Sequence, residues 1–360
     1  MGRTHTRGGR STARMLAALC VTGVVAATGA CGAGSGTSSG GSAATTKDTW
    51  VHGILKPKGD SGYQLMAKEK EYYKKQGVNV ELKEFVGNVQ LVQALVSGAI
   101  DSGDTAPAPI YDAVKKGSDL KIIGSTLPKI TYALITTSDI KSFKELQGKT
   151  IGASAPGAFP DSVTRAMLAE KGMDPNSVKV VSAGSDAQRF KALLSGRIDA
   201  AAVSDQFVPK AQKNPKINVL GEAQDVIPQY PRFYLIANGN SLQEKPDAAV
   251  KFLAGEIQGL CYAVTHPKAE RQVAAKHINS SPDNPQIVYV QKAIAKAGAA
   301  SATSAITMSR LKWLQQFRME QGFQKGKVDL GQLVDPSVRK KALKQVDLPQ
   351  KCMNDPNIEN

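Results

Sequence analysis

The stretch that decides the fold is Ala94-Leu95-Val96-Ser97-Gly98-Ala99-Ile100-Asp101, which recurs as Ala192-Leu193-Leu194-Ser195-Gly196-Arg197-Ile198-Asp199. A β-rich run precedes each copy, at 78–85 and at 178–181, and a short polar loop containing glycine follows that run. Each block therefore predicts a strand, a tight loop, a short helix that ends at glycine, and a second strand. Chance can produce one such repeat, but it is less able to reproduce the order of the segments around it.

The similarity between the two halves extends upstream of the repeat. Thr49–Leu55 and Thr150–Ala153 are predicted strands, and each is followed by a loop with Gly and Pro and then by a helix, at 64–75 and at 162–171. Two similar halves of this kind predict an α/β protein with two Rossmann-like lobes and mainly parallel sheets.

Two short apolar segments, Tyr132–Thr137 and 233–237, are predicted to be crossover strands between the lobes. They place lobe one at 47–133, lobe two at 134–234, and the second part of lobe one at 235–360. After the second crossover, apolar residues three and four apart predict a helix entered through Pro246, and similar patterns cover 269–278, 286–297 and 309–322. These C-terminal helices are expected to pack on lobe one.

The N-terminus has the pattern of an export signal. Residues 1–14 carry four arginines and no acid, and residues 15–30 are apolar or small. We expect a signal peptide at 1–30 and lipidation of Cys31, since Cys20 follows the bulky Leu19; the alternative is an ordinary signal with an incidental cysteine. Residues 31–46, mostly Gly, Ser, Ala and Thr, predict a flexible linker. The mature chain would then be anchored in the cell membrane by lipid, facing outside the cytoplasm.

The charge and the cysteine content further restrict the classes of function that the sequence allows. The formal charge is +15, or +11 without the four signal arginines, and the lysines are scattered, so nucleic-acid binding is not expected. Cys261 and Cys352 remain beyond the signal and anchor. In an oxidising compartment they could form a disulfide that holds the C-terminal tail on a helix, or they could be free thiols.

A ligand site is expected where parallel strands end beside helix N-termini, which attract anions. Each lobe supplies three such loops, and the six loops would line one cleft between the lobes. They are 56–63, 86–89 and 103–107 in lobe one, and 154–162, 183–187 and 203–207 in lobe two.

Within these loops and beside the second crossover, polar and aromatic residues are candidate ligand contacts. They are Asp60, Ser61, Tyr63, Gly87, Asn88, Asp104, Thr105, Ser154, Gly157, Phe159, Asp205, Phe207 and Tyr234. Several have a structural alternative: Ser61 as a helix N-cap, Gly87 and Asn88 as a turn, Asp104 and Thr105 as caps, Tyr234 as core. Asp205 ends a strand that looks buried, where a carboxylate is costly unless paired.

Catalytic motifs are weak. Gly148-Lys149-Thr150 resembles the end of a phosphate-binding loop, but Phe143 occupies the position that must be glycine. The histidines have no metal-type spacing, so neither a metal nor a cofactor is expected. Asp104 and Asp205 could act as acid and base or bind a cationic group of a solute, and without a nucleophile the second is preferred.

Five segments carry a resemblance to a known family. They are Glu-Phe-Val-Gly-Asn at 84–88, the run at 94–105, the run at 140–152, Gly-Arg-Ile-Asp-Ala at 196–200 and Phe-Tyr-Leu at 233–235. Over about 49–265 the chain resembles the periplasmic-type solute-binding proteins for nitrate, aliphatic sulfonates, taurine and pyrimidine precursors.

The resemblance implies a type II periplasmic-binding-protein fold, a monomer, and a partner ABC permease with a separate ATPase. Sulfonate-type members often have Trp-Asp-Pro-Phe where this chain has Ser204-Asp205-Gln206-Phe207, so the identity of the solute stays open. Two alternatives also stay open: an enzyme on the same fold, such as a pyrimidine-synthesising protein, and the binding subunit of a membrane sensor.

Overall fold

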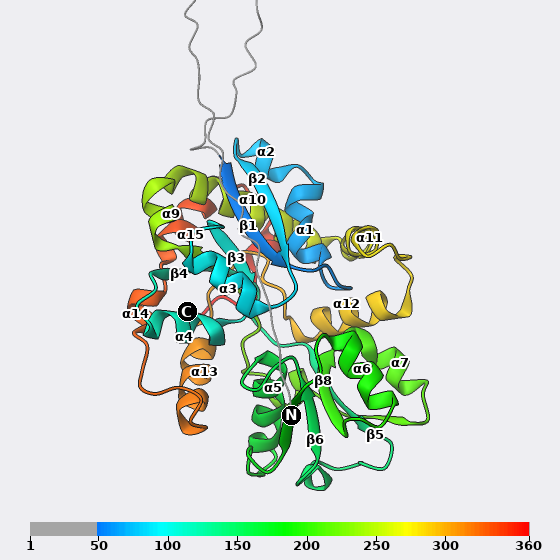
Figure 1. The fold of residues 1–360 in the computed structure, drawn as a ribbon. Helices are drawn as coiled ribbons and strands as arrows, with labels where there is room; N and C mark the ends of the chain where they lie inside the picture. The colour runs from blue at the N-terminus through cyan, green and yellow to red at the C-terminus, as the bar shows by residue number, and fades with distance from the viewer. Residues whose placement is uncertain (1–48, 360) are drawn as a thin grey trace, which may run out of the picture. The chain divides into compact units, whose positions relative to one another are not determined.

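The computed structural model describes residues 49–359. The predicted signal peptide, the predicted lipidation site at Cys31 and the predicted linker at 31–46 lie outside these residues. The described chain contains two five-stranded sheets, the first mainly from blue and cyan strands and the second mainly from green ones (Figure 1).

The first sheet has the strand order β2-β1-β3-β10-β4. Strand β1 runs parallel to β2 and β3, whereas β10 is antiparallel to β3 and β4. The strands are β1 (Thr49–Leu55), β2 (Asn79–Phe85), β3 (Ser102–Thr105), β4 (Leu120–Leu127) and β10 (Phe233–Asn238).

The second sheet repeats this order as β7-β6-β8-β5-β9. Strand β6 runs parallel to β7 and β8, and β5 is the antiparallel member beside β8 and β9. The strands are β5 (Tyr132–Thr137), β6 (Thr150–Ala153), β7 (Lys179–Ser182), β8 (Ala200–Ser204) and β9 (Ile217–Glu222). The predicted pair of similar α/β lobes is confirmed.

The two expected crossover strands do not bridge the sheets. β5 belongs wholly to the second sheet and β10 wholly to the first, and each pairs along both edges inside its sheet. The chain changes sheet just before each of them, between β4 and β5 and between β9 and β10. The boundaries expected at 133/134 and 234/235 therefore fall inside strands, because a short buried strand satisfies its backbone hydrogen bonds only within a sheet.

Helices connect the strands, and the predicted positions of most are confirmed to within a few residues. The predicted helix at 64–75 is wrong in one respect: it breaks at Glu71, whose φ of 56° is left-handed. The helices up to β10 are α1 (Gly62–Glu69), α2 (Tyr72–Lys75), α3 (Asn88–Val96), α4 (Pro107–Lys115), the 3-10 turn η2 (Phe143–Leu146), α5 (Phe159–Glu170), α6 (Asp186–Leu194), the turn η3 (Asp205–Phe207), α7 (Val208–Gln212) and α8 (Ala223–Val226).

The repeated octapeptide has the same structural role in each lobe. Gly98 and Gly196 follow α3 and α6 with φ of 73° and 69°, a conformation that favours glycine. Asp101 Oδ2 accepts a hydrogen bond of 2.8 Å from a backbone N–H of β1, and Asp199 Oδ2 accepts one of 2.7 Å from a backbone N–H of β6. The repeat therefore encodes a helix stop and a carboxylate that ties the helix–strand connection to the central strand.

The C-terminal region is helical, as predicted, and α10 packs against α1 and α15 of the first lobe. Helix α12 departs from the expectation because it also contacts η3 and α7 of the second lobe. Across residues 49–359, no helix has the length and apolar character needed to span a membrane. The helices after β10 are α9 (Gly239–Glu244), α10 (Pro246–Thr265), α11 (Pro267–His277), α12 (Pro285–Ala297), α13 (Met308–Glu320), α14 (Leu330–Leu333), α15 (Pro336–Leu343) and α16 (Gln350–Met353).

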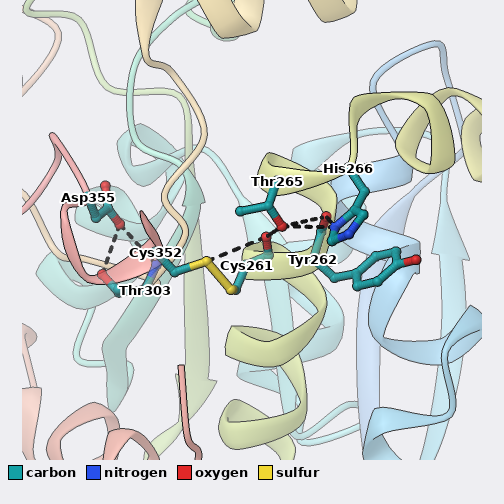
Figure 2. The surroundings of a disulfide bond; sticks show 7 residues. All are labelled: Cys261, Tyr262, Thr265, His266, Thr303, Cys352 and Asp355. Atoms are coloured by element: carbon teal, nitrogen blue, oxygen red, sulfur yellow. Dashed lines mark hydrogen bonds between the residues drawn. A yellow bond between two sulfur atoms is a disulfide. The ribbon is translucent and has the colours of Figure 1, made fainter. Parts of the chain in front are cut away.

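A disulfide joins α10 to α16 through Cys261 and Cys352, whose Cα atoms are 5.6 Å apart (Figure 2). Both cysteines are buried. The adjoining tail is held by Asp355, whose Oδ2 accepts hydrogen bonds from the Thr303 hydroxyl at 2.8 Å and from the Thr303 backbone at 2.9 Å. The covalent bond and these polar contacts together fix the C-terminal tail to the first lobe.

Candidate functional site

Arg232 lies at the centre of the polar groups between the two sheets, and the sequence analysis missed it. It precedes β10, where the chain returns to the first sheet, and its side chain is 2% exposed. Its Nη1 donates to Thr131 Oγ1 at 2.6 Å, just before β5, and its Nη2 forms an ion pair with Asp60 Oδ2. One guanidinium thus links both connections between the sheets to the first loop of lobe one.

Asp104 and Thr105 are the last two residues of β3. Asp104 Oδ2 accepts hydrogen bonds from Thr126 Oγ1 at 2.7 Å and from the Gln64 amide, while Oδ1 has no hydrogen-bond partner within residues 49–359. Burial raises the pKa of Asp104 to about 7, although these hydrogen bonds and the charge of Arg232 oppose the rise. The carboxyl group is therefore close to its protonation midpoint at neutral pH.

Asp205 is a buried carboxyl group of lobe two, directly after β8. Its Oδ2 accepts a hydrogen bond of 3.1 Å from Gln224 Nε2, and its Oδ1 is unpartnered in the described chain. Burial, followed by the charge of Glu222, raises the pKa of Asp205 to about 8, and Arg232 opposes this rise. Glu222, which the sequence analysis also missed, accepts a 2.6 Å hydrogen bond from Tyr289 on α12.

A third buried carboxyl group comes from α11. Glu270 is fully buried, and the Gly62 backbone N–H lies near its carboxyl group, but neither oxygen makes a hydrogen bond of normal geometry in the described part of the chain. Burial and then the charge of Asp60 raise its pKa to about 8. The pKa of Tyr63 is raised by burial and then by Glu270 and Asp60, so this predicted residue belongs to the same group.

Direct contacts join the loops of the two lobes. Lys58 Nζ lies 3.1 Å from Asp186 Oδ2, and the backbone N–H of Gly59 donates to Gln206 Oε1 at 3.1 Å. Burial alone would raise the pKa of Asp186, but Lys58 and Arg189 outweigh it and hold the pKa well below its usual range. Asp186 is thus an ionised, paired carboxylate, unlike Asp104 and Asp205.

Several predicted residues of lobe one are held by contacts within that lobe. Ser61 Oγ accepts a 2.8 Å hydrogen bond from the Lys58 backbone, which orders the first loop, and it makes no cap bond to α1. Thr105 Oγ1 donates to Asn88 Oδ1 at 2.8 Å, and Gly87 is the N-cap residue of α3. These contacts hold the loops after β1, β2 and β3 in fixed positions.

The remaining predicted residues divide between the loops of lobe two and the core. Phe159 packs edge-on against Tyr132 with ring centroids 5.3 Å apart, while Ser154 is exposed. The Gly157 N–H donates to a carboxylate of its own loop at 2.7 Å. Phe207 and Tyr234 are core residues: Phe207 packs in the apolar cluster of the second lobe, and Tyr234 is fully buried with its hydroxyl 3.3 Å from a backbone carbonyl.

The site residues can bind and orient a polar solute. Within residues 49–359, no three His, Cys, Asp or Glu side chains are placed to share a metal ion. His52 is buried away from the loops in lobe one, contacts the Ser102 hydroxyl at 2.7 Å, and has its pKa lowered to about 3 by burial. The polar groups at the site are thus carboxyls, amides, hydroxyls, Lys58 and two arginines.

Residues 60–270 match the family model described as NMT1/THI5 like. A Haemophilus influenzae protein named for thiamine biosynthesis is 27% identical over 215 residues, covering 56% of this chain and 65% of that protein. The 4-amino-5-hydroxymethyl-2-methylpyrimidine phosphate synthase of Aspergillus parasiticus is 26% identical over 239 residues, covering 62% of this chain and 69% of the synthase. The chain thus spans just under two thirds of the length of the Haemophilus protein.

Solved structures share the fold. The alkanesulfonate-binding protein SsuA from Xanthomonas axonopodis pv. citri superposes with a TM-score of 0.68 at 16% identity, over 81% of this chain and 99% of SsuA. The nitrate-binding protein NrtA from Synechocystis PCC 6803 gives 0.69 at 13% identity, over 87% of this chain and 92% of NrtA. The predicted type II periplasmic-binding-protein fold is confirmed.

Proposed function

The chain belongs to the NMT1/THI5-like family, and we propose that it is the extracytoplasmic solute-binding component of an ABC importer. The observation that carries this proposal is the convergence of loops from two similar lobes on one set of buried polar groups around Arg232. Such an arrangement binds a small organic solute between the lobes and delivers it to a permease that works with a separate ATPase.

The contacts between the lobes support a binding cycle. The contacts that Lys58 and Gly59 make with the second lobe are one ion pair and one neutral hydrogen bond, so they can break and re-form at a modest cost in free energy. A solute that contacts both lobes stabilises their association and shifts the population toward the closed form. The proposed contacts are Asp60, Tyr63 and Asp104 from lobe one and Asp205 from lobe two.

The N-terminal region supports the same role. A signal peptide at 1–30 and a lipid on Cys31 would place the folded chain outside the cytoplasm, held to the membrane through 31–46. The disulfide between Cys261 and Cys352 agrees with an oxidising compartment. We propose that the protein acts there as a monomer.

An enzyme on the same fold is the second candidate, because one relative is named as a pyrimidine phosphate synthase. Asp104 and Asp205 have pKa values of about 7 and 8, which suit acid–base chemistry. No activated nucleophile accompanies them in the site assembled from residues 49–359, and this favours binding.

Isothermal titration calorimetry of the protein against sulfonates, nitrate, taurine, pyrimidines and small amines tests the proposal. We expect saturable binding of one class with a stoichiometry of one. Arg232→Met should abolish that binding, and Arg310→Met, on α13 outside the site, is the matched control. Turnover of a bound solute would support the enzyme instead, and no saturable binding in the whole panel would contradict the importer role.

A further inference from the structure

The loops between the lobes carry an unusual number of aspartates. Five of the six loops place one at or near the start of a helix or turn, and only 86–89 lacks one. These residues are Asp60, Asp104, Asp161, Asp186 and Asp205. A carboxylate at this position already interacts with the partial positive charge of the helix N-terminus, which would otherwise attract an anionic ligand.

Some of these carboxylates are neutralised within the protein. Asp60 pairs with Arg232, Asp186 pairs with Lys58 and Arg189, and Asp161 pairs with an arginine one turn later on α5 at 2.7 Å. These three groups therefore have their counter-charges. A ligand is not needed to balance them.

Three other carboxyl groups have no cationic partner within residues 49–359: Asp104, Asp205 and Glu270. Each is fully buried, and together they leave four carboxyl oxygens without a hydrogen-bond partner in that part of the chain. Buried polar atoms in folded proteins are nearly always paired, so unpaired acceptors at one site indicate a missing donor. One donor at the site, Arg232 Nε, is also without a partner, so most but not all of the missing groups are donors. The three carboxyls become negatively charged only when they lose their protons.

From this imbalance we infer that the solute is a compact organic cation with several N–H donors, such as a guanidinium, amidinium or alkylammonium compound. The inference rests on the proposed solute-binding function and specifies its substrate class. The N–H groups would donate to Asp104 from lobe one and to Asp205 from lobe two, and Glu270 would add negative charge on the side of α11. A metal ion fits less well, because no three of the described acidic side chains are placed to share one.

The protonation of the site links binding of a cation to pH. Asp104 is surrounded by the charged or titratable groups Asp60, Arg232, Tyr73 and Glu256. A bound cation lowers the pKa of the carboxyls it contacts, so a proton leaves when the cation binds. Affinity for a cation should therefore rise with pH, by up to about tenfold per unit for each proton released, while affinity for an anion should fall.

The pKa values of the other two carboxyls are also raised, because burial and neighbouring acids outweigh Arg232 at Asp205 and Arg271 at Glu270. Asp205 is surrounded by Glu222, Tyr289, Arg232 and Asp60. Besides Asp60, Glu270 faces Arg271 and Tyr63, and its pKa of about 8 is still raised. Because these surroundings leave both carboxyls protonated near neutral pH, each can release a proton to an incoming cation.

The test is calorimetry of the full chain in mild detergent with two cations, guanidinium and methylammonium, and two anions, methanesulfonate and nitrate. Their charges stay constant from about pH 6 to about pH 9. We expect a cation to bind at least threefold more tightly at the higher pH. Asp205→Asn should weaken that binding at least tenfold, and Glu69→Gln, whose partners Lys276 and His277 lie on α11, should leave it unchanged.

The outcomes separate this inference from the proposed function. Binding of only an anion, or binding of a cation that weakens as the pH rises, would overturn the cationic solute and leave a solute-binding protein. Cation binding that Asp205→Asn does not weaken would also overturn the inference. Failure of all four probes would overturn the cationic solute, and only failure of the wider panel with taurine and pyrimidines would count against the binding function as well. The pH series on the unmodified chain keeps the test valid even if a variant does not fold.

Discussion

Reduction of the Cys261–Cys352 disulfide should cost the protein about 2–5 kcal/mol of unfolding free energy. The two cysteines are 91 residues apart, and a cross-link over that separation removes loop-closure entropy worth up to about 4.6 kcal/mol from the unfolded chain at 25 °C. The lower end of the range allows for structure that persists in the unfolded chain. The bond also anchors the tail on which Asp355 binds Thr303, so both effects act on one region.

The assay is urea unfolding of the unmodified chain, oxidised and then reduced, followed by tryptophan fluorescence. The reduced chain keeps both sulfur atoms, so no cavity term enters the difference. Cys352→Ala should remove the response to reductant, which controls for Cys20 and Cys31. A change below about 1 kcal/mol would refute the reasoning, because a loop of this length would then carry little entropy.

Three further outcomes are expected from substitutions. Asp205→Asn should be about 1–3 kcal/mol more stable than the parent above pH 8 and similar to it near pH 4. The reason is that a folded-state pKa of about 8 makes the parent lose stability as the pH rises toward that value. Urea titrations across this pH range measure the difference in unfolding free energy. Gly259→Ala should destabilise the protein by about 1–3 kcal/mol, since its Cβ would lie 2.6 Å from the backbone N of Ala67, and the melting temperature reports this. Lys58→Met should change the unfolding free energy by less than about 1 kcal/mol, because the partly exposed ion pair of Lys58 with Asp186 is screened by solvent. The same substitution should raise the dissociation rate of a bound solute in stopped-flow measurements.

The order of strands and helices along each lobe was predictable because its determinants are local. Gly98 and Gly196 end equivalent helices, and Asp101 and Asp199 bind equivalent strands, so one octapeptide repeated in the sequence specifies the same connection twice. The loops at the strand ends followed from the same pattern. Asp104 and Asp205 could be named as candidates from the sequence, since a carboxyl group at the end of a buried strand is costly unless it is paired.

The centre of the site was not predictable, because its contacts join residues distant in sequence. Arg232 and Asp60 are 172 residues apart, and the apolar pattern of α11 predicted that the helix packs on lobe one but not that Glu270 lies on its buried face. A charged residue directly before the apolar strand β10 was the one available signal for Arg232. Phe207 was selected by its position in a loop, but its ring turns to the core, and strand-end position alone does not specify side-chain direction.

The unpaired carboxyl oxygens link stability to function. Each buried acceptor without a donor lowers the stability of the empty protein by about 1–3 kcal/mol. A solute that donates to these oxygens removes the penalty only when both lobes contact it, so the penalty favours the closed, ligand-bound state over the empty one. The parent should therefore gain more thermal stability from its solute than Asp205→Asn does, although the variant should be the more stable of the two without solute. An equal gain in both proteins would mean that these carboxyl groups are structural and that the solute binds elsewhere.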